Sequence, residues 1–170
     1  MDTLSHGLYG GIAFGRRSTK DYLTAFLFGI GPDILSFGPF FLGAIFGLQD
    51  WPSHGAEPPD PQMIPGFVHA LYNITHSLLI YAFFFVLIWW LGKKHFAQLT
   101  LGWPLHILVD IPTHSSVFFP TPFLWPISNF FVDGHPWASP EIFIPNIVIL
   151  VGLYAFWYTQ RKKTKQKQKQ

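Results

Sequence analysis

The chain has 170 residues, of which 49% are hydrophobic and only 12% are charged. Charged residues make up about 25% of a typical soluble domain, so this composition favours a membrane protein over a water-soluble globule. The absence of cysteine excludes disulfides and thiolate metal sites. The length predicts a single membrane-embedded domain, residues 1–160, followed by a disordered basic tail at 161–170.

The basic residues are unevenly distributed along the chain. All eleven Lys and Arg fall at 16–20, at 93–94 and at 161–169, and apolar segments separate them from the acids of 50–60 and 133–141. Because positive segments stay on the cytoplasmic side, this pattern predicts a multi-pass protein of the bacterial inner membrane with both termini in the cytoplasm. The basic tail directly follows an apolar segment, so we expect it to lie near anionic lipid, and we expect no nucleic-acid partner.

The N-terminal half predicts a short helix and one broken apolar stretch. The first residues are typical of a helix capped by Asp2 or Thr3, and their glycines permit close packing. In the apolar stretch 21–48, the letters "GIGPD" predict that a second helical piece begins at Pro32, with Asp33 near its N-terminus. A Pro-rich acidic loop is expected at 49–65.

The second half predicts the remaining membrane helices. Residues 66–92 carry no charge and would span about 40 Å as one helix, enough to cross a bilayer core of about 30 Å. A weaker helix is expected at 95–111, an interfacial Pro-aromatic loop at 117–140 and a last span at 142–158. The expected fold is therefore all-α: an integral membrane bundle of about four membrane helices plus the short N-terminal helix.

The letters "HILVDIPTHSS" place three ionisable residues at intervals of four, His106, Asp110 and His114. On a helix they would lie along one stripe, although Pro112 predicts that the helix kinks or ends near Ile111 and leaves His114 in the next turn. Ionisable groups at membrane depth are costly and usually functional. The alternative is that Asp110 caps a turn and the histidines are interfacial.

Further candidates lie in other apolar segments. His69, Asn73 and His76 share one helix face, as ligands or as a polar cap, and Asp33 is either a ligand or a helix N-terminal acid. Nitrogen and oxygen donors suit a divalent cation, either Zn²⁺ or Mn²⁺. His6, near the N-terminus, adds to these candidates, which are more numerous than the four ligands of one zinc. We therefore predict a site of one or two ions, in which some of the candidates would hold the ligands rather than bind metal. We expect His54, His95 and His135 to be solvent or interface residues.

At these residues the sequence resembles a known family. The motifs "LSHGLYGGIAFG", "GIGPDIL", "NITHSLL" and "GWPLHILVDIPTHSSVFFPTPFLWP", within residues 1–126, are similar in order and spacing to the YdjM-like family of LexA-binding, inner-membrane-associated, metal-dependent hydrolases. That family is itself similar to the all-helical zinc phospholipase C bundles. The resemblance implies hydrolysis of a lipid-type phosphoester and metal roles for five residues: His6, Asp33, His76, His106 and Asp110.

Two departures from the family pattern set the ranking of the candidates. Tyr72 and Asn73 stand where many members have His-Arg, so an arginine that would clamp phosphate is missing, and His114 follows Asp110 more closely than in the soluble relatives. We therefore assign catalysis to Asp33, His76, His106 and Asp110, and keep His69, Asn73 and His114 as lower-rank candidates.

The leading hypothesis is a membrane-bound hydrolase that cleaves a lipid-type phosphoester with metal-activated water. The alternatives are a metal or proton transporter, a haem-binding membrane subunit, or a scaffold whose core histidines are all satisfied. One conflict stays open: the basic residues place His6 near the cytoplasmic side, whereas His76 and Asp110 belong further outward. Either the first helix re-enters the membrane or His6 is not a ligand.

Overall fold

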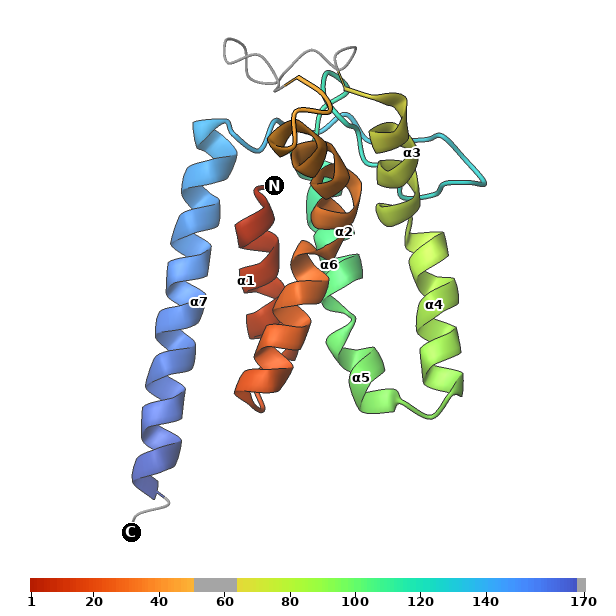
Figure 1. Ribbon diagram of the computed structural model, residues 1–170. Helices are drawn as coiled ribbons and strands as arrows, with labels where there is room; N and C mark the ends of the chain where they lie inside the picture. Colours follow the sequence, from red (N-terminus) through yellow and green to blue (C-terminus); the bar gives the residue numbers. More distant parts are fainter. Residues whose placement is uncertain (51–63, 168–170) are drawn as a thin grey trace.

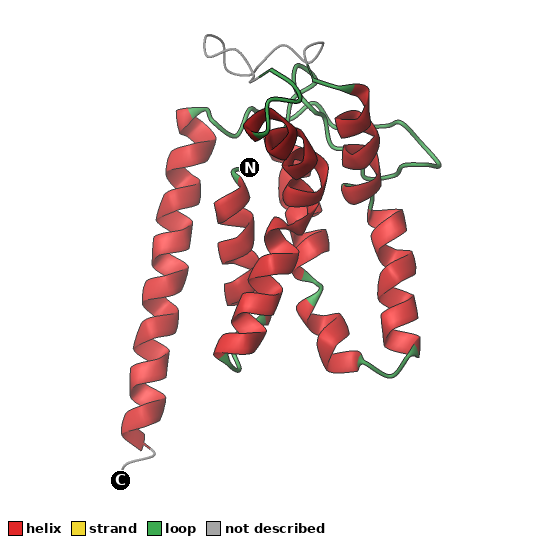
Figure 2. Cartoon of the chain, viewed as in Figure 1, coloured by secondary structure: helices red, strands yellow, loops and turns green. Residues whose placement is uncertain are grey.

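The computed structural model describes residues 1–50 and 64–167, with side chains as far as residue 162. The predicted acidic loop 49–65 therefore lies mostly outside the described residues. Helices form all the regular structure of the described part, which contains no strand, and this confirms the all-α prediction (Figures 1 and 2). In chain order they are α1 (Thr3–Phe14), α2 (Thr19–Ile45), α3 (Gly66–Thr75), α4 (Leu78–Trp90), α5 (Lys94–Leu99), α6 (Gly102–Thr113) and α7 (Pro140–Lys167).

α1 and α2 form a closely packed helical hairpin. The side chain of Asp2 accepts a hydrogen bond from the Ser5 N–H and caps α1, as expected. The two backbones approach so closely that a Cβ atom added at Gly29 would lie 2.5 Å from the carbonyl oxygen of His6. Glycine is therefore required where α2 crosses α1, and this contact sets the position of the N-terminal helix.

α2 is one helix, so the prediction of a new helical piece at Pro32 was wrong. Pro32 and Pro39 both lie inside it. A proline removes one backbone hydrogen bond, but neighbouring helices in a membrane bundle can supply other partners for the freed groups. Here Pro32 is itself buried against the rest of the bundle, and its turn carries Asp33 inward.

The segment 66–92 is not the single straight helix that its composition predicts. It divides into α3 and α4, which are bent by 52° at a short break. Ser77 at the break has an extended backbone and its side chain accepts from the Ile80 N–H, which caps α4. The Pro-aromatic loop supplies hydrogen-bond acceptors for the polar groups at the break. The Leu78 N–H donates to the Phe123 carbonyl, and the Ser77 hydroxyl donates to the Trp125 carbonyl. Tertiary contacts therefore override the local helical preference.

The expected helix at 95–111 is also divided, into α5 and α6. At about 1.5 Å per residue α6 is about 18 Å long, too short to cross a bilayer core alone. By length and composition α2 and α7 can each cross a membrane, and α3 with α4 forms a third span if the bent pair counts as one. The described helices thus support two or three of the four expected spans. Residues 114–139 contain no helix, in agreement with the predicted loop.

α7 lies along α1 at the side of the bundle and extends beyond its expected end at Tyr158 (Figure 1). It continues to Lys167, so the first part of the basic segment is helical rather than disordered. Lys, Arg and Gln are good helix formers, and extending an existing helix needs no new nucleus. The turn between α1 and α2, the turn between α4 and α5 and the C-terminal end of α7 all lie at one end of the molecule, and these carry the basic residues (Figure 1).

Candidate metal centre

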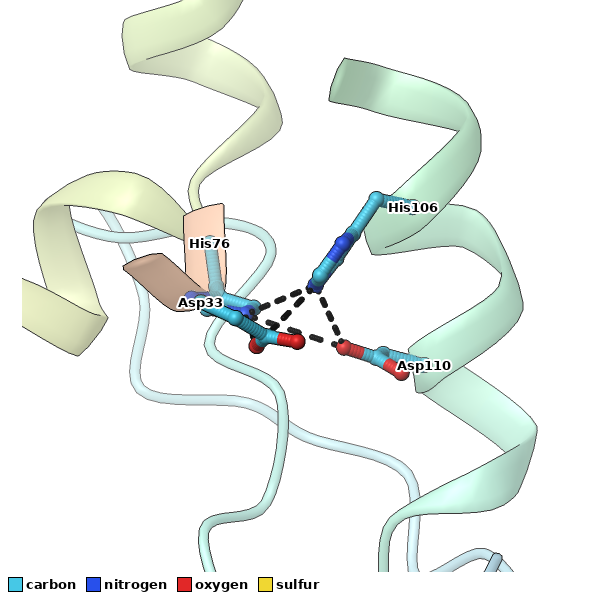
Figure 3. A group of neighbouring side chains, drawn as sticks. All are labelled: Asp33, His76, His106 and Asp110. Atoms are coloured by element: carbon cyan, nitrogen blue, oxygen red, sulfur yellow. Dashed lines mark hydrogen bonds and ion pairs between the residues drawn. The ribbon is translucent and has the colours of Figure 1, made fainter. Parts of the chain in front are cut away.

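Four side chains from three parts of the chain converge inside the bundle (Figure 3). Asp33 comes from α2, His76 from the break between α3 and α4, and His106 and Asp110 from successive turns of α6. One donor atom of each residue lies within 4.8 Å of those of the others. His76, His106 and Asp110 are fully buried, whereas the Asp33 side chain keeps 13% of its surface exposed. The cluster is therefore buried except at Asp33, whose side chain is partly exposed.

Asp33 is held by α1 in an orientation that leaves one oxygen free. The Thr3 hydroxyl donates to Oδ2 of Asp33 at 2.6 Å. Oδ1 faces the two imidazoles instead, at 3.6 Å from Nε2 of His76 and 3.5 Å from Nε2 of His106. The N-terminal helix thus fixes the rotamer of a predicted ligand.

His76 depends on the break in the helix. Its Nδ1 lies 3.2 Å from the Tyr72 carbonyl and 3.0 Å from the Thr75 hydroxyl oxygen. That hydroxyl already donates to the Leu71 carbonyl, so it accepts from His76 and Nδ1 must carry the proton. Nε2 of His76 consequently presents its lone pair to the cluster.

His106 is oriented in the same way by α2. Its Nδ1 lies 2.7 Å from the Gly29 carbonyl oxygen, which can only accept, so Nδ1 is the donor and Nε2 carries the lone pair. The spacing of four residues on α6 then places Asp110 beside it, with Oδ2 3.0 Å from Nε2 of His106. Backbone carbonyls thus set the tautomer of both imidazoles, as is usual for metal-ligating histidines.

The resulting arrangement fits a cation. The two Nε2 atoms lie 3.1 Å apart, and two facing lone pairs repel unless a cation or a shared proton lies between them. Oδ2 of Asp110 is buried and makes no hydrogen bond within the described part of the chain, which is costly for a carboxylate. Two imidazole nitrogens with two carboxylate oxygens form a complete ligand set for zinc. No Lys or Arg of the described residues forms an ion pair with Asp33 or Asp110.

The remaining candidates fall into two classes. His6 and His114 face the other oxygen of Asp110, with their Nε2 atoms 2.9 and 3.6 Å from Oδ1. His69 and Asn73 do not belong to the four-residue group, and the His69 ring stacks on Phe119 with the ring centroids 4.5 Å apart. α6 continues through Pro112 to Thr113, beyond the expected end near Ile111, and His114 follows the helix as predicted.

The structure places both His6 and the N-terminus beside Asp110. α1 runs from the cluster toward the basic turn at 15–18, so its first turn, and not its last, brings His6 to Asp110 (Figure 1). The amino group of Met1 contacts Asp110 and lies 3.2 Å from Nε2 of His114. Residue 1 therefore lies at the cluster, one length of α1 away from the basic turn, and the cytoplasmic location of both termini stays a prediction.

Sequence reasoning missed three groups that support the centre. Tyr72 stacks on the ring of His76, with centroids 3.7 Å apart, and its hydroxyl donates to the Phe119 carbonyl. The sequence indicates Thr3 only as a helix cap and Gly29 only as part of a helix break. The spacing of Tyr72 four residues before His76 could have indicated the first; the other two depend on helix crossings that no local pattern encodes.

Comparison with known families decides the relationship. A family model described as YdjM inner membrane protein matches residues 1–168. The chain belongs to this family. The match confirms the resemblance deduced from the motifs and identifies the chain as an inner membrane protein, which agrees with the apolar helices. No curated protein and no solved structure matches the chain, so the similarity to zinc phospholipase C bundles is not confirmed.

Proposed function

We propose that this protein is a membrane-bound, metal-dependent hydrolase that cleaves a phosphoester. Asp33, His76, His106 and Asp110 would hold the metal. The observation that carries the proposal is the pair of buried imidazoles whose lone pairs face one another, 3.1 Å apart, between two carboxylates. A scaffold with satisfied histidines would not leave buried donors and acceptors in this arrangement.

The donor set indicates the class of cation and its chemistry. Nitrogen and oxygen donors suit Zn²⁺, and Mn²⁺ is also possible. When bound, such a cation activates water and offsets negative charge on a phosphoryl oxygen. The residues around it hold the ligand geometry: Thr3 orients Asp33, the Gly29 carbonyl orients His106, and the Tyr72 ring supports His76. The Lys and Arg side chains of the described residues lie at the far end of the molecule, so the bound cation and the Met1 amino group beside Asp110 must compensate the phosphate charge (Figure 1).

A lipid-type substrate is favoured by the surroundings of the centre. The loop between α6 and α7 packs against the break beside His76, and it exposes apolar side chains at Val117, Ile127 and Phe130. Large apolar side chains exposed on a loop suit contact with the bilayer interface. In this proposal the basic end is cytoplasmic and the centre lies toward the opposite face, where the loop presents a phospholipid headgroup to Asp33.

The test is hydrolysis by the purified full chain in detergent. We expect cleavage of a synthetic phosphodiester and of phosphatidylglycerol in mixed micelles, with dependence on Zn²⁺ or Mn²⁺ and loss of activity after chelation. Asp110→Asn keeps the size of the side chain and should reduce turnover to background, whereas His95→Ala, an exposed histidine in α5 at the basic end of the molecule, should not. Metal-dependent binding without cleavage of either substrate would contradict the proposal.

The same preparation tests the other functions considered for the sequence. A haem subunit would show a visible absorption band, but the approach of His76 to His106 leaves no room for a planar macrocycle between the two nitrogens. Protein reconstituted in vesicles that takes up Zn²⁺ or Mn²⁺ without hydrolysing lipid would indicate a transporter instead.

A further inference from the structure

The amino group of Met1 lies inside the centre. It contacts Oδ1 of Asp110, and it lies 3.3 Å from the Thr113 hydroxyl oxygen and 3.2 Å from Nε2 of His114. An ammonium group carries three N–H bonds and accepts no hydrogen bond. Three groups from the last turn of α6 and its cap thus surround it, one for each N–H bond, and Asp110 is also one of the proposed metal ligands.

All three partners of this amino group are hydrogen-bond acceptors. The Asp110 carboxylate can only accept when it is ionised. The Thr113 hydroxyl donates to the Val109 carbonyl at 2.9 Å, so its lone pairs are available to the amino group. Nδ1 of His114 lies 3.0 Å from the Phe119 carbonyl oxygen, so Nδ1 carries the proton and Nε2 the lone pair. The site therefore matches an ammonium group, whereas an amide with its single N–H bond would leave two of these acceptors unpaired.

The amino group gives the two oxygens of Asp110 different surroundings. Oδ1 is held by Met1 and lies 2.9 Å from Nε2 of His6. Oδ2 lies 3.0 Å from Nε2 of His106 and makes no hydrogen bond within the described part of the chain. No Lys or Arg of the described residues pairs with this buried carboxylate, so the amino group is the cation that offsets its charge. Oδ2 is thus left to face a metal ion.

Thr3 acts on the other carboxylate of the centre in the same way. Its hydroxyl donates to Oδ2 of Asp33 and leaves Oδ1 to face the two imidazoles. Residues 1–3 therefore hold one oxygen of each proposed carboxylate ligand and leave the other oxygen to the cluster.

We infer that the free α-amino group of Met1 is a positioning group of the metal centre, which holds Oδ1 of Asp110 and so directs Oδ2 to the cation. The inference rests on the proposed function, because it needs a bound metal. A formyl group or a residue added to Met1 would convert the ammonium into a neutral amide with one N–H bond. Asp110 would then lose its support, and metal affinity should fall about 10–100-fold, as is typical when a group that orients a metal ligand is lost.

The experiment measures the Zn²⁺ affinity of full chains in detergent by competition with a chelator of known affinity. One chain begins at Met1, one carries a short Gly-Ser extension before Met1 that a protease removes completely, and one carries the same extension after Gln170. We expect affinity to fall about 10–100-fold with the N-terminal extension alone, and to return when the protease exposes Met1 again. The intact mass of the metal-loaded chain without extension should correspond to an unblocked Met1.

Thr113→Val separates positioning from a general disturbance of the fold. In the chain that begins at Met1 it removes one acceptor of the amino group, and it should lower the affinity by less than the extension does. In the chain with the N-terminal extension it should have no further effect, because the contact is already lost. Additive losses would show that the extension disturbs the structure elsewhere, and would overturn the inference.

The outcomes separate this inference from the proposed function. Equal affinity with and without the N-terminal extension, or a blocked Met1 on the metal-loaded chain, overturns the inference and leaves the hydrolase proposal standing. No metal on any of the chains overturns both. If the extended chain does not elute as a monodisperse species, Thr113→Val in the chain that begins at Met1 decides, because an unchanged affinity contradicts the role of the amino group.

Discussion

The metal centre and the flanking helix α7 use polar residues in opposite ways. The centre is formed by α1, α2, α3 and α6. In the centre, ionisable groups are buried and face one another, supported by backbone carbonyls of neighbouring helices. α7 exposes apolar side chains along its length and is joined to α1 through a few polar contacts, chiefly those of Asn146 and Tyr154. Within a membrane, helix contacts rely on close packing and a few hydrogen bonds, so polar residues are retained where they bind or join helices.

Close packing should matter in the centre and not in α7. Gly29→Ala places a Cβ atom 2.5 Å from the His6 carbonyl, so α1 must shift, and we expect a loss of about 1–3 kcal/mol in the free energy of unfolding together with weaker metal binding. The matched variant Gly152→Ala on α7 meets nothing within 4 Å and should be neutral or slightly stabilising. Unfolding in a denaturing detergent measures both. Equal effects of the two variants would remove the distinction between the regions.

Hydrogen bonds to the proposed metal ligands should affect metal binding, whereas hydrogen bonds within α7 should not. Thr3→Val removes the donor to Asp33 while keeping the shape of the side chain, and we expect metal affinity to fall about 10–100-fold. Thr159→Val on α7 loses only a hydrogen bond to the Phe156 carbonyl of its own helix and should bind metal as the wild type does. Competition with a chelator of known affinity measures the change. An unchanged affinity in Thr3→Val would show that Asp33 needs no support from α1.

The attachment of α7 should depend on one buried side chain. Asn146 accepts from the Tyr9 hydroxyl and donates to Ser5, next to His6. Because hydrogen bonds between membrane helices contribute about 0.6–1.7 kcal/mol, Asn146→Ala should destabilise the protein by about that amount. Val148→Ala, on the exposed side of the same helix, serves as the control. Detergent-induced unfolding distinguishes them, and similar values for both would mean that packing alone holds α7.

The smallest expected effect lies in the loop outside both regions. The Ser116 N–H donates to Asp133 and holds the pKa of this exposed carboxyl below its usual value. A lowered pKa in the folded state contributes stability above the unfolded pKa of about 3.9, and this is lost as pH falls through the lower folded value. The protection factor of the Ser116 amide, which removes the intrinsic pH dependence of hydrogen exchange, should therefore fall slightly in acid, and in Asp133→Asn it should be lower already at pH 7. A protection factor that does not change with pH would contradict this contact.

Local patterns predicted the parts of the molecule that depend on local chemistry. Composition indicated the membrane helices, Asp2 was expected as a cap, and the i, i+4 spacing placed His106 beside Asp110. Residue types and motif order also selected Asp33 and His76, the partners that the structure brings to this pair.

Interruptions of helices were predicted poorly, because tertiary contacts decide them. Pro32 carried a strong local signal for a helix start, yet α2 continues through it. No local signal marked the break at His76, which depends on loop carbonyls almost fifty residues later in the chain. The support from Gly29 and Phe119 likewise comes from helix and loop crossings that a single sequence does not encode.

The central claim is that the four converging side chains hold a metal. Elemental analysis of the full chain purified in detergent tests it most directly, with the double variant His106→Ala/Asp110→Ala compared with the wild type. We expect stoichiometric Zn²⁺ or Mn²⁺ on the wild type and none on the double variant, although both insert into the membrane and elute as monodisperse species. Equal metal content in the two proteins, or no metal on the wild type after loading, would contradict the claim.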